Sequence, residues 1–339
     1  MTGSIEIASN GVAVAGNPRT LKAPQPALPF GVLAQGRRNT EIRSLIITGF
    51  SQGVMIDGGT QNRILNNEIR DLARFACGIC LYKTTQNIVS DNRVIAINGD
   101  GLVITANSSQ NHVIANVLRH STINLKIMDA GTNLILRNQI EGDGQNFLDG
   151  VVLIRADGNQ FYENEIFNYG GSGATLDHSN GNQFWYNTFT NSTFLAALVV
   201  RDSIDNKAVC NDFDANGTGV RFDFMTVNNV AVLNNFLTAD TAVDLGGPKA
   251  NKFDLGRPIG NHWNVNAPAC VDVNPADGIC DAPYAFNGNV DNSPRVMPIP
   301  WRNNRDECLK AGPPKPIDPP PQQRPPQQKP QQKPPPAQQ

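Results

Sequence analysis

Residues 159–166 read NQFYENEI, and residues 182–189 read NQFWYNTF. In both stretches an Asn is followed five positions later by a second Asn, and apolar residues stand two and seven positions after the first. The pattern occurs eight times, at intervals of 22 to 26 residues. Its members are Asn62/Asn67, Asn87/Asn92, Asn111/Asn116, Asn133/Asn138, Asn159/Asn164, Asn182/Asn187, Asn206/Asn211 and Asn229/Asn234. A fixed period of this length indicates a repeat protein, which offers long faces and not a closed pocket.

Each repeat contains three short segments with the periodicity of strands. Two of them follow the two Asn residues, and a third, usually opened by Gly, comes next, as in Gly101–Ile104 and Gly219–Phe222. Apolar residues alternate within them at a spacing of two, which suits a strand with one buried face. The sequence therefore predicts an all-β fold, a single-stranded right-handed parallel β-helix of about ten rungs stacked about 4.8 Å apart.

The paired Asn residues are predicted to be structural. They fall where the chain turns between strands, and Asn tolerates the left-handed backbone conformation that turns require. When rungs stack in register, their amides can also hydrogen-bond to one another along the axis. A leucine-rich repeat has a similar period, but its Leu spacing is missing here.

The chain divides into a solenoid domain, residues 1–311, and a tail, residues 312–339. A capping region is expected at about 258–311. The tail is rich in Pro, Gln and Lys, which predicts a disordered, extended segment that is either a tether to the cell envelope or another protein, or a plain disordered end. The start, Met1–Glu6, lacks the basic and apolar regions of a signal peptide, so we expect that the export signal and the N-terminal cap are missing from it.

Composition excludes several classes of function. The formal net charge of -2 argues against a nucleic-acid surface, and no apolar run approaches the roughly 20 residues that span a bilayer. Cys77 and Cys80 form a C-x-x-C without a second pair at zinc-ribbon spacing, so structural or disulfide use is favoured over metal or redox chemistry. Cys270 and Cys280 bracket a short loop and are expected to form a disulfide if the protein is exported.

The C-terminal region carries a family resemblance. It reads GNHW at 260–263, DVNPADGICDAPY at 272–284 and DNSP at 291–294. Together with the Asn repeats, this resembles the NosD-type branch of the pectate-lyase-like β-helix proteins, over roughly residues 40–301. The resemblance implies a secreted or periplasmic right-handed β-helix that binds or processes carbohydrate, although one branch helps to mature a copper enzyme. It assigns no catalytic residue, because the family shares a scaffold and not one active site.

Outward side chains at the end of each third strand form two columns along the axis. Alignment of the repeats places in the first column Asp57, Tyr82, Thr105, Met128, Arg155, Asp177, Arg201 and Asp223. The second column contains Gly58, Lys83, Ala106, Asp129, Ala156, His178, Asp202 and Phe224. We expect a cluster on one edge of the solenoid from Asp129, Arg155, Asp177, His178, Arg201, Asp202 and Asp223.

A polyuronate lyase or epimerase needs a set of this kind. It must neutralise the carboxylate of the sugar and remove the proton from C5. Arg155 and Arg201 are the candidate neutralisers and His178 is the candidate base. Asp177 or Asp202 would orient the imidazole.

Two other interpretations of the same columns remain open. A glycoside hydrolase would use two carboxylates, and Asp177 and Asp223, two rungs apart, fit the longer separation of 6.5–9.5 Å that one mechanism requires. Alternation of Arg and Asp is also what a surface charge ladder without catalytic function would show, because it avoids like-charge repulsion between rungs.

A third outward column is mostly apolar. It contains Leu65, Ser90, Ile114, Leu136, Tyr162, Trp185, Val209 and Val232. With the neighbouring Tyr186, its aromatic members Tyr162 and Trp185 are predicted to form a stacking platform for sugar rings, and Asp129 is a further candidate substrate contact. Alternatively, the terminal segment or a partner covers the column, since an exposed apolar strip usually marks an interface.

A loop before the C-terminus has oxygen ligands at spacings similar to a Ca²⁺ loop. Its candidate ligands are Asp272, Asn274, Asp277 and Asp281. A cap rich in turns, with side chains bonded to the backbone, explains the same residues. Copper binding is not predicted, because the four His residues fall at unrelated rung positions.

These observations predict an exported carbohydrate-active protein that binds, and either cleaves or epimerises, an extended and acidic polysaccharide. The enzyme classes considered are polysaccharide lyase, epimerase and glycoside hydrolase. The alternative is a non-enzymatic binding, adhesive or periplasmic assembly-accessory module. Successive rungs repeat their contacts at regular spacing, which suits a polymeric ligand.

Overall fold

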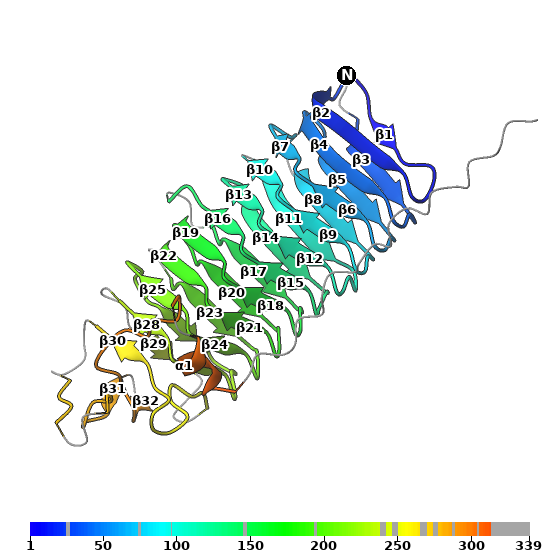
Figure 1. Ribbon diagram of the computed structural model, residues 1–339. Helices are drawn as coiled ribbons and strands as arrows, with labels where there is room; N and C mark the ends of the chain where they lie inside the picture. The colour runs from blue at the N-terminus through cyan, green and yellow to red at the C-terminus, as the bar shows by residue number, and fades with distance from the viewer. Residues whose placement is uncertain are drawn as a thin grey trace, which may run out of the picture.

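The computed structural model describes residues 1–24, 28–73, 76–95, 97–144, 148–192, 195–237, 242–245, 250–264, 270–273, 277–286, 289–303 and 305–312, without the side chains of Pro18 and Asp244. Short strands stack in one long solenoid that runs from the blue N-terminal rungs to the yellow C-terminal ones (Figure 1). Apart from one antiparallel hairpin, the strand pairs are parallel. The predicted all-β, parallel β-helix fold is confirmed.

Face 1 of the solenoid is an 11-stranded sheet formed by the third strand of each repeat. Its strands are β1 (Ile5–Glu6), β3 (Phe30–Gln35), β5 (Gln52–Asp57), β8 (Ala76–Tyr82), β11 (Gly99–Thr105), β14 (Ile123–Met128), β17 (Val151–Ile154), β20 (Ala174–Asp177), β23 (Leu198–Arg201), β26 (Val220–Phe222) and β29 (Ala242–Asp244). The early strands β1 and β3 show that the solenoid begins before residue 40.

Faces 2 and 3 follow the first and the second Asn of each repeat and together form a 19-stranded sheet. Face 2 contains β6 (Arg63–Leu65), β9 (Ile88–Ser90), β12 (His112–Ile114), β15 (Leu134–Leu136), β18 (Gln160–Tyr162), β21 (Gln183–Trp185), β24 (Lys207–Val209) and β27 (Val230–Val232). Face 3 contains β7 (Glu68–Arg70), β10 (Arg93–Ile95), β13 (Val117–Arg119), β16 (Gln139–Glu141), β19 (Glu165–Tyr169), β22 (Thr188–Ser192), β25 (Asp212–Asp214), β28 (Asn235–Phe236) and β30 (His262–Trp263). The longer strands β2 (Ala13–Lys22) and β4 (Glu41–Thr48) continue this sheet at its N-terminal end.

The interior is filled by the apolar side chains at the inward-facing strand positions, and each of them stacks on its equivalent in the adjacent rung. Phe161 and Phe184 lie with their ring centroids 4.5 Å apart and their planes within 6°. Phe213 and Phe236 stack at 5.1 Å, and Phe236 continues onto Trp263 at 4.2 Å. Equivalent positions of successive repeats stack on one another. The alternation of apolar residues in one repeat therefore predicts which residues of the next repeat lie in the core.

The Asn pairs form two ladders along the axis, as predicted. In the second ladder Asn164 donates from its backbone N–H and from Nδ2 to Oδ1 of Asn187, at 3.0 and 2.9 Å, and Asn187 repeats both bonds to Asn211. The side chain of Asn187 is fully buried. These amides therefore satisfy backbone groups at the buried corners of the solenoid.

One detail of the turn prediction is wrong. The left-handed residue at each corner is the one before the ladder Asn, not the Asn itself. Tyr186, before Asn187, has φ 61°, and Glu163, before Asn164, has φ 55°. The Asn keeps an ordinary backbone conformation so that its amide can reach the adjacent rung.

The C-terminal region closes the end of the core. The ring of Trp263 lies 4.8 Å from that of Tyr284 on β31 (Tyr284–Phe286), which pairs with β32 (Asn289–Asp291) as the antiparallel hairpin. The Nε1–H of Trp263 donates to Oδ2 of the buried Asp291 at 2.8 Å. The hydrogen-bonded Trp and Asp of the two C-terminal motifs thus meet in one cap.

A C-terminal strap, residues 299–303 and 305–312, turns back along the solenoid. It contains the short helix α1 (Asp306–Leu309), drawn in orange-red beside the rungs in Figure 1. Cys308 of this helix forms a disulfide with Cys210. The strap thereby joins the end of the described chain to a rung 98 residues earlier.

The remaining boundaries stay predictions. The proposed tail begins at 312, but residues 313–339 lie outside the described part of the chain. Among the described helices none has the length and apolar character needed to cross a bilayer.

Candidate functional site

The charged edge, defined as Asp129, Arg155, Asp177, His178, Arg201, Asp202 and Asp223, lies where face 1 turns into face 2. The strand register corrects one position of the alignment. Ile154, and not Arg155, pairs with Met128 and Asp177 in the first column. Arg155 therefore lies in the second column, between Asp129 and His178. Arg155 and His178 are thus neighbours in one column, although the guanidinium bonds to Asp129 on the rung before.

Arg155 and Asp129 form a two-pronged ion pair. Nε and Nη2 of the arginine donate to the two carboxylate oxygens at 2.6 and 3.0 Å. These hydrogen bonds lower the pKa of Asp129 and raise the pKa of Arg155. The side chains are 59% and 43% exposed for Arg155 and Asp129, so water screens the pair and it adds little to stability.

Asp177, His178 and Asp202 converge one rung further along. Nδ1 of His178 lies 2.6 Å from Oδ1 of Asp177. Because a carboxylate only accepts, Nδ1 carries a proton, and in the neutral imidazole the lone pair is then on Nε2. One ligand atom from each of the three residues lies within 4.8 Å of the others. Such a nitrogen and two oxygens can act in proton transfer or hold a divalent cation.

Arg201 and Asp223 complete the edge. Nε of Arg201 donates to one carboxylate oxygen of Asp223 at 3.0 Å, and Nε of Arg221 donates to the other at 2.6 Å. The sequence analysis missed Arg221, which lies two residues before Asp223 on the same outward side of β26. Its position in an outward-facing period-two pattern was the signal that could have identified it.

The expected sugar platform is wrong for this structure. Tyr162, Trp185 and Tyr186 are only 4%, 1% and 4% exposed. They belong to a second apolar cluster beneath the strap, together with Trp301 and Cys308. The outward column has the register that the sequence predicted, but the terminal segment covers its later members, from Tyr162 to Val232. The alternative reading of that column, a covered surface, is the one that the structure bears out.

The acidic loop before the C-terminus uses its carboxylates for turns. Asp272 accepts the backbone N–H of Gly278 at 2.7 Å, and Asp281 accepts that of Val273 at 2.9 Å. Nε and Nη2 of Arg257 donate to the two carboxylate oxygens of Asp277, both at 3.0 Å. Asn274, the remaining candidate ligand, lies outside the described residues. The described contacts are those of a capping loop, and a Ca²⁺ role for it stays a prediction.

The cysteines are all paired in the described chain. Cys77 is bonded to Cys80, and Cys270 to Cys280, as the sequence analysis favoured. The bond between Cys210 and Cys308 was not foreseen, since nothing in their spacing predicts that the strap returns to that rung.

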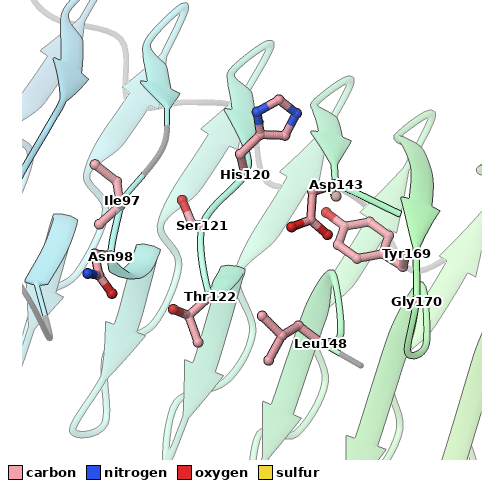
Figure 2. A pocket seen from close by; sticks show the side chains of 10 residues that line it. Ile97, Asn98, His120, Ser121, Thr122, Asp143, Leu148, Tyr169 and Gly170 are labelled. Carbon is pink, nitrogen blue, oxygen red and sulfur yellow. The ribbon is translucent and has the colours of Figure 1, made fainter. Parts of the chain in front are cut away.

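A groove that the sequence analysis also missed lies at the opposite border of face 1, where face 3 leads into it. Its volume is about 280 Å³. Figure 2 shows side chains from several successive rungs around it, among them His120, Ser121, Thr122, Asp143, Leu148 and Tyr169. The corner loops there differ in length from rung to rung, so no column alignment could place these residues together.

A second, larger groove of about 380 Å³ runs between face 3 and the strap. Arg137, Arg302 and Arg305 line it, and Arg137 and Arg305 both contact Glu163 at 2.6 Å. Arg302 donates to Asp212 at 3.0 Å. The arginines are thus engaged in fastening the strap to the rungs.

The family comparison fits this architecture. The family model described as "Periplasmic copper-binding protein (NosD)" matches residues 10–197 and 127–269. The chain belongs to the NosD family. The resemblance read from the Asn repeats and the C-terminal motifs of this NosD-family chain is thereby confirmed. A search of curated proteins finds no significant match.

Solved structures share the fold at low sequence identity. The A-module of the mannuronan C-5 epimerase AlgE4 from Azotobacter vinelandii has a TM-score of 0.56 and 11% identity, covering 78% of either chain. The AlgE6 A-module from the same organism gives 0.55 and 14%, over 69% of this chain and 71% of that one. Tailspike protein 2 of the Escherichia coli O157:H7 bacteriophage CAB120 gives 0.51 and 12%, over 64% of this chain and 34% of the tailspike. At such identities the likeness establishes the fold alone.

Proposed function

We propose that this NosD-family chain is an exported β-helix protein that binds an extended acidic polysaccharide along the charged edge and modifies it there. The observation that carries the proposal is the Asp177–His178 contact of 2.6 Å on an exposed surface. Arg155 lies in the same column one rung before His178, and Arg201 pairs in register with Asp177 one rung after. A base oriented by a carboxylate and flanked by two guanidinium groups suits proton removal next to a carboxylate.

The proposed chemistry is abstraction of the proton at C5 of a uronate. Asp177 holds the Nδ1–H of His178, so Nε2 accepts the C5 proton while Arg155 and Arg201 stabilise the negative charge that develops on the sugar carboxylate. Delivery of a proton from water to the opposite face of C5 gives epimerisation, and His178 then releases its proton to the solvent. Expulsion of the oxygen at C4, with formation of a C4–C5 double bond and protonation of the leaving oxygen, gives a lyase. Asp202 and Asp223 support the imidazole and Arg201, respectively.

Export is part of the proposal. The family description refers to periplasmic proteins, and all described cysteines are paired in disulfides, which persist in oxidising compartments. The structural neighbours include epimerases of mannuronan and a phage tailspike, which agrees with a polysaccharide ligand for this fold. We further propose that the Pro/Gln-rich residues 312–339 tether the domain to the envelope or to another protein.

The proposal is tested by following acidic polysaccharides with proton NMR, with and without Ca²⁺. Wild-type protein should produce new anomeric or unsaturated-sugar signals. Replacement His178→Asn should reduce their rate about 10²- to 10⁴-fold, the usual contribution of a general base. The matched control is Lys83→Asn, because Lys83 occupies the same column with the same left-handed backbone, φ 53° against 49° for His178.

Two results would sink this assignment. The first is a panel of polyuronates that gives neither new signals nor line broadening with wild-type protein. The second is a turnover that His178→Asn leaves at the rate of the Lys83→Asn control. Line broadening without new signals would move the function to non-enzymatic polymer binding.

A second candidate function is a non-enzymatic, periplasmic assembly-accessory role with a bound metal ion. The family description names copper, and Asp177, His178 and Asp202 offer one imidazole nitrogen and two oxygens within 4.8 Å, a donor set that suits Cu²⁺ or Zn²⁺. The ion pairs of Arg155 and Arg201 are formed with Asp129 and Asp223. A cation would occupy the lone pair that the base requires, so the two functions compete for one imidazole. Calorimetric titration of Cu²⁺ into wild type and His178→Asn distinguishes them. If the three residues form a metal site, the heat of Cu²⁺ binding seen with wild type should be lost in the variant.

A further inference from the structure

The groove at the border between faces 3 and 1 contains buried polar groups that the charged edge does not use. Tyr169 at its floor is only 3% exposed. Its Oη accepts a hydrogen bond of 2.6 Å from Nδ2 of Asn124. Nδ2 also donates to the backbone carbonyl of Glu141 at 2.7 Å, which fixes the orientation of the amide. The proton of the Tyr169 hydroxyl is therefore directed away from Asn124.

A second hydroxyl in the groove is similarly placed. The Oγ of Ser121 is buried and has no hydrogen-bond partner among the described residues. Its backbone N–H donates to Oδ1 of the same Asn124 at 3.1 Å, so one amide positions both Ser121 and Tyr169. A buried hydroxyl without a partner costs about 1–3 kcal/mol, and a ligand that accepts from it recovers that cost.

The space around Tyr169 is shaped by two glycines. A Cβ at Gly142 would lie 2.8 Å from the Tyr169 ring, and a Cβ at Gly150 would lie 2.6 Å from it. Either side chain would displace the ring. The phenol therefore reaches the floor of the groove only because both neighbours are glycine.

The walls of the groove combine apolar and polar groups. Ile97 and Leu148 provide aliphatic surface, while Asp143 provides hydrogen-bond acceptors and His120 lies at the rim (Figure 2). Burial raises the pKa of Tyr169, so the phenol stays a donor across the physiological range. An acidic ligand would meet the carboxylate of Asp143, whereas a neutral ring with alternating hydroxyl and C–H groups would match both kinds of wall.

We propose that this groove is a binding site for one neutral sugar ring, with the hydroxyls of Tyr169 and Ser121 donating to the sugar and with Ile97 and Leu148 against its C–H face. The volume of about 280 Å³ is just below the range of about 300–1,000 Å³ for sites that hold drug-sized ligands, which limits the occupant to about one ring. The proposal does not depend on acidic polymer chemistry at the charged edge. It adds a second carbohydrate contact on the other border of face 1.

Saturation-transfer NMR with the methyl glycosides of glucose, galactose, mannose and N-acetylglucosamine tests the site. At least one should bind wild-type protein. Tyr169→Phe removes one hydroxyl and keeps the ring in its space. It should weaken the binding of that sugar about fivefold, as expected for the loss of one neutral hydrogen bond. Ser121→Ala should have a similar effect, and Thr122→Trp, which fills the groove from its exposed rim, should abolish binding.

The matched control is Tyr82→Phe, which removes a hydroxyl elsewhere on face 1 and should leave binding unchanged. His178→Asn should also leave it unchanged, so failure of the charged edge and failure of this groove give different results. The proposal is overturned if none of the four sugars receives saturation, or if the Thr122→Trp variant binds as well as wild type. Equal weakening by Tyr82→Phe and Tyr169→Phe would overturn it as well.

Discussion

The second Asn ladder and the charged edge are both columns made by stacking one rung position on the next, yet they differ in every physical respect. In the ladder each amide is buried and bonds to the rung before and the rung after. On the charged edge the side chains are largely exposed, and ion pairs join only some of the rungs, Asp129 with Arg155 and Arg201 with Asp223. The buried ladder amides are bonded within the protein, whereas exposed side chains can bond to water, so residue identity can vary more on the charged edge.

The ladder stabilises the fold, whereas the charged edge is available for chemistry. A ladder position inside the stack favours Asn, because the adjacent rungs require both a donor and an acceptor at the same point; at the N-terminal end Thr40 and Leu45 take this position and donate to the rung after. A position on the charged edge can hold many residue types. The requirements of the fold therefore do not explain why Asp177, His178 and Asp202 occur together there. The predictions below break or sharpen this contrast, from the largest expected effect to the smallest.

The largest effect is expected from Asn187→Ala. The substitution leaves the buried N–H of Asn164 and the carbonyl of Phe161 without their partner. Two buried backbone groups at about 1–3 kcal/mol each predict a loss of about 2–6 kcal/mol in the free energy of unfolding, measured by urea denaturation. Asn191→Ala is the control, since its exposed amide makes a single bond of 3.2 Å to Asn168. Equal losses in the two variants would refute the role of the ladder.

Release of the strap should have the next largest effect. The double replacement Cys210→Ser and Cys308→Ser removes a cross-link over 98 residues, and Cys270→Ser with Cys280→Ser removes one over 10. The loss of chain entropy in the unfolded state predicts about 4.7 kcal/mol for a loop of about 100 residues against about 2.7 for a loop of 10, both upper values. Tryptophan fluorescence during denaturation reports the outcome, since Trp301 belongs to the strap and Trp185 lies beneath it. The reverse order of the two losses would contradict a strap held by its disulfide.

Reversal of the ion pair on the charged edge should change function without changing stability. Asp129→Arg combined with Arg155→Asp keeps one positive and one negative group on the same two rungs, both of them exposed. The thermal unfolding midpoint should stay within experimental error of wild type. If Arg155 contacts the polymer, the affinity for an acidic polysaccharide should fall, as measured by titration. Unchanged affinity would identify the column as a plain charge ladder.

The smallest effect concerns pH. Burial lowers the pKa of His262, whose Nδ1–H donates to the carbonyl of Arg295 at 3.1 Å. The unfolded chain then binds the proton more readily than the folded one, so the contribution of His262 is fully present above a pH of about 6.5 and is lost as the pH falls through the lowered pKa. Wild type should lose more stability than His262→Gln between about pH 7.5 and pH 5. A difference that grows as the pH rises would contradict this sign.

Most of the fold could be predicted from the sequence because one rung specifies the next. The spacing of Asn159 and Asn164, with Phe161 and Ile166 between and after them, contains the corner, the strand and the core position together. The register of the apolar outward column at Tyr162 and Trp185 followed from the same spacing. Residues that recur in each repeat occupy equivalent places in successive rungs, and stacking of the rungs buries their apolar side chains.

The sequence-based prediction was wrong or incomplete where the repeat pattern does not determine the structure. The run Val151–Ile154 is apolar throughout, so the alternation that marks the last buried residue is lost, and Arg155 was placed one position out of register. The strap returns to the solenoid through a contact between Cys210 and Cys308, which no local pattern encodes. The groove at Tyr169 is formed by corner loops of unequal length, and these loops are outside the repeat pattern as well.

The most direct test of the account measures unfolding and turnover on the same preparation of His178→Asn. The account predicts that the urea midpoint equals that of wild type, because His178 is exposed and outside both ladders, and that modification of an acidic polysaccharide, followed by proton NMR, is lost. Turnover that survives the substitution, or a loss of stability like that expected for Asn187→Ala, would contradict the assignment of chemistry to the charged edge and of structure to the ladders.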